Sequence, residues 1–136
     1  MTALSCVSKP ASRRADRIRK FASILWVVLM ACVIIGSLLP ASSSVLWAAG
    51  WLPLNDKGQH FGAYLGLSLL PVIGFQNGRR GLLAGLSMFV LSLLLEAGQH
   101  FAPGRTVDLG DVLANGAGVG CGVVLARLIR GPIDNL

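Results

Sequence analysis

Four apolar stretches separated by short polar or glycine-rich turns dominate the hydropathy pattern of the chain. They cover approximately residues 21–39, 58–75, 82–101 and 110–129. At about 1.5 Å per residue, a helix of about 20 apolar residues crosses the hydrocarbon core of a bilayer. The pattern therefore predicts an all-α membrane protein with four transmembrane helices. They would form one helical bundle over residues 21–136, preceded by a basic segment at residues 1–20.

Composition supports the bilayer as the solvent for most of this chain. Hydrophobic residues make up 54% of its 136 residues and charged residues 13%, about half the charged fraction of a soluble domain. A basic start followed by an apolar run is also typical of a cleaved signal peptide. However, the run at residues 21–39 exceeds a signal core of about 7–15 residues, and no small-residue cleavage site closely follows it. We therefore expect the first stretch to remain as a membrane helix.

The positions of the basic residues predict the orientation. Ten of the 12 Lys and Arg residues lie in the N-terminal segment, in the Arg79-Arg80 turn or near the C-terminus, whereas only Lys57 and Arg105 lie in the other two loops. Because cytoplasmic loops are rich in Lys and Arg, both termini are predicted to be cytoplasmic. The net charge of +6 is then explained by the topology and by contact with membrane lipids as partners. Nucleic acid is not expected as a partner. The three cysteines have no metal-ligand spacing, and no disulfide is expected.

With this topology, most of the remaining polar residues collect at the outer ends of the last three helices. An ionisable group at membrane depth is costly unless it finds a partner or water. Helical spacing of i, i+3 or i+4 places neighbouring members of the group on one face of each helix. The predicted polar cluster, which is also the predicted ligand-binding site, consists of Asp56, Lys57, His60, Tyr64, Glu96, Gln99, Arg105, Asp111 and Asn115.

Small residues continue inward from these polar positions. Gly118 and Gly122 follow Asn115, while Ser92 and Gly85 lie below Glu96. Because small residues let membrane helices approach closely, the third and fourth helices are expected to pack together. A separate stripe of Gly58, Gly62 and Gly66 is expected to receive another helix, such as the first. Asp108 fits an N-cap of the fourth helix.

Three chemical interpretations of the cluster remain open. In the first, Lys57 and Arg105 hold an anionic head group such as a phosphate, and the candidates for acid–base catalysis are His60, Glu96 and Asp111. No nucleophile motif accompanies them, so the sequence does not decide whether the protein is an enzyme. In the second, the same charges only pair with one another, hold the helix ends together and dock a partner.

Metal binding is the third interpretation. The ligands would come from His60, Glu96, His100 and Asp111, since imidazole and carboxylate groups are common metal ligands. Two histidines without a recognised motif do not favour it. The sequence therefore predicts no metal and no cofactor.

Two motifs in this region resemble a known family. The first is Asp56-Lys57-x-x-His60, and the second runs Glu96-x-x-Gln99, Arg105, then Asp108-x-x-Asp111-x-x-x-Asn115. Together they are similar to the D-K-x-x-H and E-x-x-Q…R…D-x-x-x-N patterns of the VanZ-like family of bacterial integral membrane proteins, over about residues 25–130. The resemblance implies an inner-membrane protein with a role in the cell envelope, linked to resistance to the glycopeptide teicoplanin or to exopolysaccharide assembly. Its partners would be a lipid-linked glycan or peptidoglycan precursor, or an envelope-assembly protein, and no settled reaction is implied.

Overall fold

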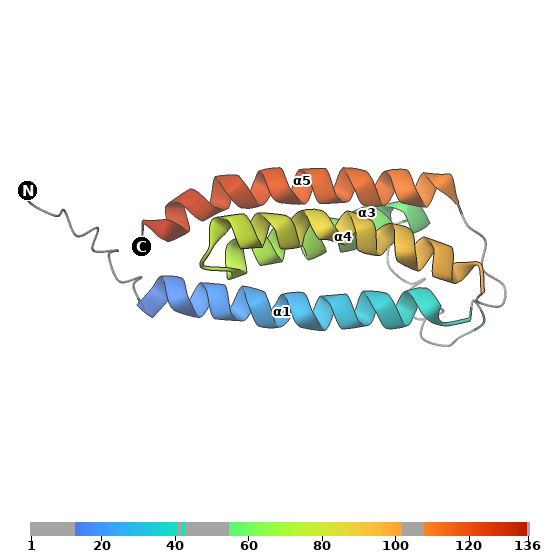
Figure 1. Cartoon of the computed structure of the whole chain (residues 1–136), viewed down its shortest axis with the longest axis horizontal. Coiled ribbons are helices and arrows are strands. Elements are labelled where there is room, and N and C mark those ends of the chain that lie inside the picture. Colours follow the sequence, from blue (N-terminus) through green and yellow to red (C-terminus); the bar gives the residue numbers. More distant parts are fainter. Residues whose placement is uncertain (1–12, 41, 43–54, 102–107, 136) are drawn as a thin grey trace, which may run out of the picture.

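The computed structural model describes residues 13–40, 42, 55–101 and 108–135, and all regular structure within them is helical. The helices are α1 (Arg13–Leu38), α3 (Asp56–Gly74), α4 (Gly78–Gln99) and α5 (Leu109–Asp134). They lie side by side as an elongated bundle, and the start of α1 and the end of α5 lie at the same end (Figure 1). The prediction of an all-α fold is confirmed.

Polar side chains define where three of the helices begin. The side chain of Asn55 accepts a hydrogen bond from Gly58 N at the start of α3, at 2.8 Å. Asn77 does the same for Arg80 N at the start of α4, at 3.1 Å, and Asp108 for Gly110 N at the start of α5, at 2.7 Å. Each cap satisfies a backbone donor that has no partner within its helix. The interpretation of Asp108 as the N-cap is confirmed.

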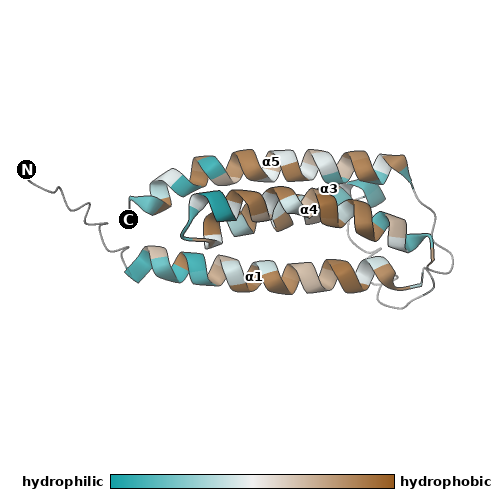
Figure 2. Ribbon diagram, viewed as in Figure 1, coloured by the Kyte–Doolittle hydropathy of each residue, from teal (hydrophilic) through white to brown (hydrophobic). Residues whose placement is uncertain are grey.

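Three of the helices, α1, α4 and α5, are long and apolar enough to cross a membrane. Figure 2 shows apolar residues along their middle sections and polar residues concentrated toward the bundle ends. The large hydrophobic side chains exposed within helices all belong to these three, as judged over the described residues. Such surfaces are suited to lipid, because a water-soluble monomer rarely exposes large contiguous apolar patches.

Helix α3 differs because it is enclosed by the other helices. It contacts α1, α4 and α5, and its most extensive contact is with α5. Leu67, Ser68 and Pro71 in its middle are almost completely buried. A helix that faces protein instead of lipid has less need of a continuous apolar surface. This is consistent with the lower mean hydropathy of α3, which is not among the three candidate membrane spans of the described residues.

The helix boundaries differ from those predicted, most of all for the first helix. It begins at Arg13 instead of residue 21, so the second half of the basic segment forms two further turns of α1. Arg19 on these turns is buried and pairs with Asp134 of α5. Ala15 and Ala22, on the same side of α1 as Arg19, are buried in the core. The packing of this face stabilises the additional turns of the helix.

Helices α4 and α5 pack together as predicted, but Gly118 and Gly122, which were expected to form that contact, bring α5 against α3 instead. A Cβ atom on Gly118 would clash with the carbonyl oxygen of Phe61, and one on Gly122 with the hydroxyl of Ser68. Gly85 of α4 likewise faces α3, since its Cβ would lie 2.7 Å from Ser68 O. The small residues of both helices therefore face α3 and not each other. Sequence spacing shows which face is small but not which helix will meet it.

The predicted separate glycine stripe of α3 is only partly used for packing. Gly66 meets Leu29 of α1, whose side chain would lie 2.9 Å from an added Cβ, whereas Gly62 has nothing within 4 Å. Gly74, nearer the end of α3, lies against Ser23 of α1, at 2.5 Å from such a Cβ. Helix α1 therefore packs on α3, as expected, but through Gly66 and Gly74.

At the end of the bundle that holds the start of α1, Arg130 clamps the C-terminus of α3. Its guanidinium donates to the carbonyl oxygens of Val72 at 2.5 Å and Phe75 at 2.9 Å, and to that of Gln76 at 2.6 Å. Its Nε atom lies 3.2 Å from the carboxylate of Asp134, which also pairs with Arg19. The last carbonyls of a helix lack partners within it, so this arginine serves as a C-cap supplied by another helix. We call this the basic end.

Candidate functional site

The opposite end gathers ionisable and polar residues from α3, α4 and α5, and we call it the acidic end. Four of these side chains belong to residues that are at least nine-tenths buried: Glu96, Gln99, Asp111 and Asn115. Lys57, on the first turn of α3, is exposed, and His60 is intermediate. Carboxylates are rarely buried without partners, so the contacts of each determine what this end can do.

Lys57 joins the start of α3 to the start of α5. Its Nζ atom lies 2.5 Å from Asp108 Oδ2 and 3.2 Å from Asp111 Oδ1. The ammonium group thus shares its charge between an exposed carboxylate and a buried one. The positive charge of Lys57 is therefore largely neutralised within the protein, which limits what it can offer a ligand.

Glu96 connects α4 to the same point. Its Oε1 atom accepts a hydrogen bond from the backbone N–H of Asp108, at 2.9 Å. A carboxylate that accepts from the N-cap residue also lies near the positive end of the α5 dipole. This geometry holds the start of α5 against α4 and gives Glu96 a positioning role.

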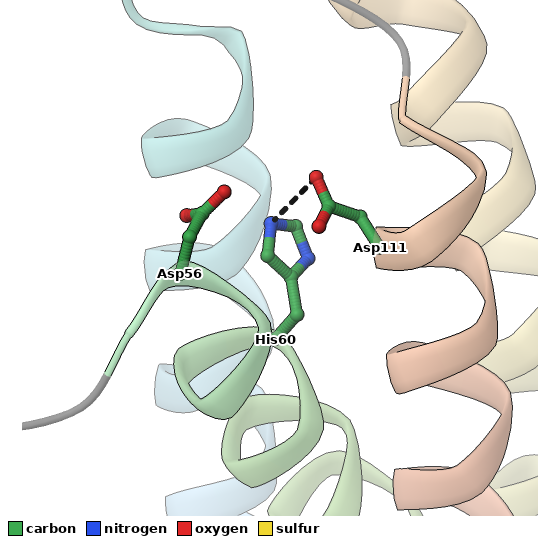
Figure 3. Close-up of side chains that lie close together, drawn as sticks. All are labelled: Asp56, His60 and Asp111. Atoms are coloured by element: carbon green, nitrogen blue, oxygen red, sulfur yellow. Dashed lines mark ion pairs between the residues drawn. The ribbon is translucent and has the colours of Figure 1, made fainter.

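His60 lies at the centre of the acidic end, where its two ring nitrogens face different groups. Nδ1 lies 3.0 Å from Asn115 Oδ1, and because an amide oxygen only accepts, Nδ1 carries the proton. Nε2 faces Asp111 Oδ2 at 3.7 Å. Figure 3 shows the ring lying between the carboxylates of Asp56 and Asp111.

The remaining predicted residues are less closely joined to this centre. Tyr64 is buried in an apolar cluster with Leu67, Met88 and Val119, with no hydrogen bond to its phenol from the residues of the described helices. Gln99 is buried near the end of α4. His100 is exposed and packs edge-on against Phe101, with ring centroids 5.5 Å apart. Arg105, predicted to bind an anion, lies outside the described residues.

Asp108 is the functional residue that the sequence interpretation undervalued. Its carboxylate both caps α5 and pairs with Lys57, and its N–H binds Glu96. The hydrogen bond from Lys57, followed by that from the Gly110 N–H, holds the pKa of the Asp108 carboxyl below its usual value of 3.8. The second motif contains Asp108, which indicates a role in the cluster. The N-cap interpretation explains the same residue without such a role, so the sequence alone did not assign Asp108 to the cluster.

Taken together, these contacts give the acidic end a clear electrostatic character. In the described part of the chain it holds four carboxylates, those of Asp56, Glu96, Asp108 and Asp111, against the single ammonium of Lys57. Three ligand atoms, one each from Asp56, His60 and Asp111, lie within 4.8 Å of one another. This centre is suited to a cation, and it can hold an anion only through additional positive charge.

The apolar surfaces of α1, α4 and α5, with a buried polar centre at one end, define a helical membrane protein. The sequence match is more specific: the chain matches the VanZ/LLP1 family model over residues 10–130. It therefore belongs to the VanZ/LLP1 family, and the resemblance inferred from its motifs is confirmed. No curated protein and no solved structure matches the chain.

Proposed function

We propose that this protein resides in the bacterial inner membrane and uses its acidic end, at the outer face, to bind the head group of an anionic or lipid-linked envelope component. The observation that carries the proposal is the burial of Asp111 and Asn115 next to a partly exposed His60, at one end of a bundle whose sides are apolar. Lipid in contact with α4 and α5 would present its head group at this level. A lipid-linked glycan or peptidoglycan precursor has the corresponding chemistry.

Orientation follows from charge in this proposal. The basic end carries Arg79, Arg80, Arg127 and Arg130 together with the basic turns of α1, and cytoplasmic segments are enriched in such residues. The proposal therefore places both termini in the cytoplasm. It also makes α3 a fourth membrane-spanning helix, enclosed by the other three.

Cysteine labelling tests this orientation. In a chain with its three native cysteines replaced by alanine, Arg105→Cys is expected to react with a membrane-impermeant maleimide added to intact spheroplasts. Arg79→Cys is expected to react only after the membrane is opened. The reverse pattern would refute the proposed orientation.

Binding is tested by native mass spectrometry of the protein in nanodiscs, made from membranes without stripping its lipids. We expect the wild-type chain to retain an anionic or lipid-linked component. His60→Ala and Asp111→Asn should each reduce its occupancy about tenfold or more, because a site that hydrogen-bonds its ligand discriminates strongly when one group is lost. His100→Ala is the matched control, since His100 is exposed at the same end and its ring packs against that of Phe101.

The same variants decide whether envelope function depends on binding. If His60→Ala folds with normal yield and melting temperature but loses both the bound component and glycopeptide tolerance or exopolysaccharide output, the binding role is supported. If His60→Ala and Asp111→Asn both retain the component at wild-type occupancy, the binding role is refuted. If the wild type converts the bound component chemically and Glu96→Gln does not, the protein also processes the component.

A structural role is the second candidate, and the contacts of Asp108 favour it. Contacts among Lys57, Asp108 and Glu96 connect the starts of α3 and α5 to the end of α4, and they need no ligand. In that case the cluster stabilises the fold and docks a protein of envelope assembly. Loss of folded yield in every acidic-end variant, with no specific lipid bound to the wild type, would favour this candidate.

A further inference from the structure

At the centre of the acidic end, the Nε2 atom of His60 faces the Oδ2 atom of Asp111. When the ring carries a single proton, on the Nδ1 that donates to Asn115, Nε2 presents a lone pair. That lone pair faces Asp111 Oδ2 at 3.7 Å. No hydrogen bond reaches Oδ2 from a described residue, since Lys57 binds the other oxygen. Two lone pairs aimed at one point repel each other unless a cation lies between them.

A third oxygen completes a ligand set at the same point. The carboxylate of Asp56, one turn before His60 on α3, approaches from the other side of the ring (Figure 3). It makes no hydrogen bond to a residue of the described chain, so both its oxygens are available. Two ligands about 2.1 Å from one ion are at most about 4.2 Å apart. The ligand atoms already lie within 4.8 Å, and Asp56 is exposed and can rotate the remaining distance.

We propose that Asp56, His60 and Asp111 bind one divalent transition-metal ion, Mn²⁺ or Zn²⁺. One imidazole and two carboxylates form a mixed nitrogen and oxygen set that suits either ion better than soft metals. The hydrogen bond from Nδ1 to Asn115 fixes the ring orientation, as the outer partner of a metal-bound histidine does. Three protein ligands leave coordination positions open to water or another ligand.

A bound ion would also resolve a conflict in the charge of the site, and this step rests on the proposed function. An anionic head group meets four carboxylates and one already paired ammonium at the described acidic end. A divalent ion held by two of those carboxylates offers its open positions to a phosphate oxygen. The ion would then make this end a site for phosphate-bearing lipids.

The metal alone provides the test. Chelator-treated full-length protein in nanodiscs of phosphatidylcholine, which lacks anionic lipid, is titrated with Mn²⁺ and followed by electron paramagnetic resonance. Mn²⁺ prefers oxygen and imidazole ligands over thiolates, so Cys32 and Cys121, which are free and exposed, do not compete. We expect one ion per chain, with a nitrogen coupling from one imidazole. Zn²⁺ is titrated in parallel on a chain with its cysteines replaced by serine.

Variants connect the signal to these residues. His60→Ala should abolish the nitrogen coupling and weaken binding at least tenfold, while His100→Ala should change neither. Asp56→Asn is the variant least expected to misfold, because Asp56 is exposed and makes no hydrogen bond to the described residues. It should weaken binding with an unchanged melting temperature. Asn115→Ala should weaken it by about 10- to 100-fold. Binding of neither ion, or binding unaffected by His60→Ala and Asp56→Asn, would overturn the metal site.

The metal site and the proposed function can fail separately. If the ion binds as expected but lipid occupancy is the same with and without it, the site stands and its role in head-group binding is refuted. If neither ion binds while lipid occupancy still depends on His60, the metal is refuted and head-group binding stands. A proton between His60 and Asp111 would appear as a pH-dependent imidazole signal unaffected by either metal, and it would overturn the proposal.

Discussion

The two ends of the bundle both bury charge, but they use it in different ways. At the basic end, Arg130 donates to three backbone carbonyls and pairs with Asp134, so every nitrogen of its guanidinium has a partner. At the acidic end, His60 Nε2 and Asp111 Oδ2 face each other at 3.7 Å, too far for a hydrogen bond, and Asp56 is not hydrogen-bonded among the described residues. Fully satisfied groups stabilise a fold, whereas a cluster of incompletely satisfied ones calls for an explanation such as a bound water, ion or ligand.

This difference also explains why the ends tolerate different changes. The basic end ties α1, α3 and α5 together through Arg19, Asp134 and Arg130, and although the Nε atom of Arg19 is buried without a partner among the described residues, all three side chains connect helices, so a substitution there affects folding directly. The acidic end separates its tasks. Lys57, Asp108 and Glu96 hold helix ends together, while His60, Asp56 and part of Asp111 remain available.

The largest effect is expected from Arg130→Met. The variant removes the donor from three backbone carbonyls at the end of α3 and leaves the half-exposed Asp134 with Arg19 alone. This costs about 2–4 kcal/mol in total, because each acceptor that loses its donor costs about 1 kcal/mol or more. The free energy of unfolding in mixed micelles should fall by that amount. Arg127→Met, on the same helix but exposed, is the control and should change it by about 0.5 kcal/mol or less. Equal effects of the two variants would mean that the clamp is not what holds the basic end.

A smaller and more selective effect is expected from the glycines. Gly118→Ala drives a methyl group into the carbonyl oxygen of Phe61, the residue that follows His60, and Gly74→Ala drives one toward Ser23 near the basic end. Each should destabilise the fold by about 1–3 kcal/mol through overpacking. Only Gly118→Ala should also weaken ligand or metal binding, because it separates α3 from α5 beside the site.

Gly120→Ala is the control for both glycine variants. Gly120 has nothing within 4 Å of an added Cβ, so the alanine should be neutral or slightly stabilising, given its higher helix propensity. Thermal unfolding and the metal titration, carried out on all three variants, check this. If Gly74→Ala reduced binding as much as Gly118→Ala, the two ends would not be independent.

The sequence predicted the elements of this fold better than their arrangement. Hydrophobic length located the four helices, because the width of a bilayer fixes how long each apolar stretch must be. It did not show that α3 is enclosed by the others, since apolar residues face both lipid and protein in a membrane. For the same reason Gly118 and Gly122 indicated a close contact but not its partner, which is α3 and not α4.

The sequence predicted which residues lie at the acidic end but not which of them contact one another. Helical spacing placed Asp56, His60, Glu96, Asp111 and Asn115 at one level, which the described helices retain. It did not indicate that Glu96 binds the Asp108 N–H or that Asn115 fixes the His60 ring. At the basic end, Arg130 and Asp134 are spaced i, i+4, but their contacts with α1 and α3 depend on tertiary packing.

The smallest effect concerns the exposed ion pair of the acidic end, and it depends on pH. The hydrogen bond from Lys57 lowers the pKa of Asp108 in the folded protein below its ordinary 3.8. The unfolded chain therefore binds the proton more readily, so this carboxylate stabilises the fold above pH 3.8. The contribution is lost as the pH falls through the lowered pKa.

Asp108→Asn removes this charge while keeping a good N-cap, so it isolates the ion pair from the helix start. At neutral pH its melting temperature should lie slightly below that of the wild type, because exposed pairs contribute little and are screened by salt. The difference should shrink as the pH falls below 3.8 and should also shrink in high salt. A difference that persisted at acidic pH would mean that the side chain of Asp108 acts through its cap on Gly110 N and not through its charge, and the ion pair would then not be what holds α3 against α5 at the acidic end.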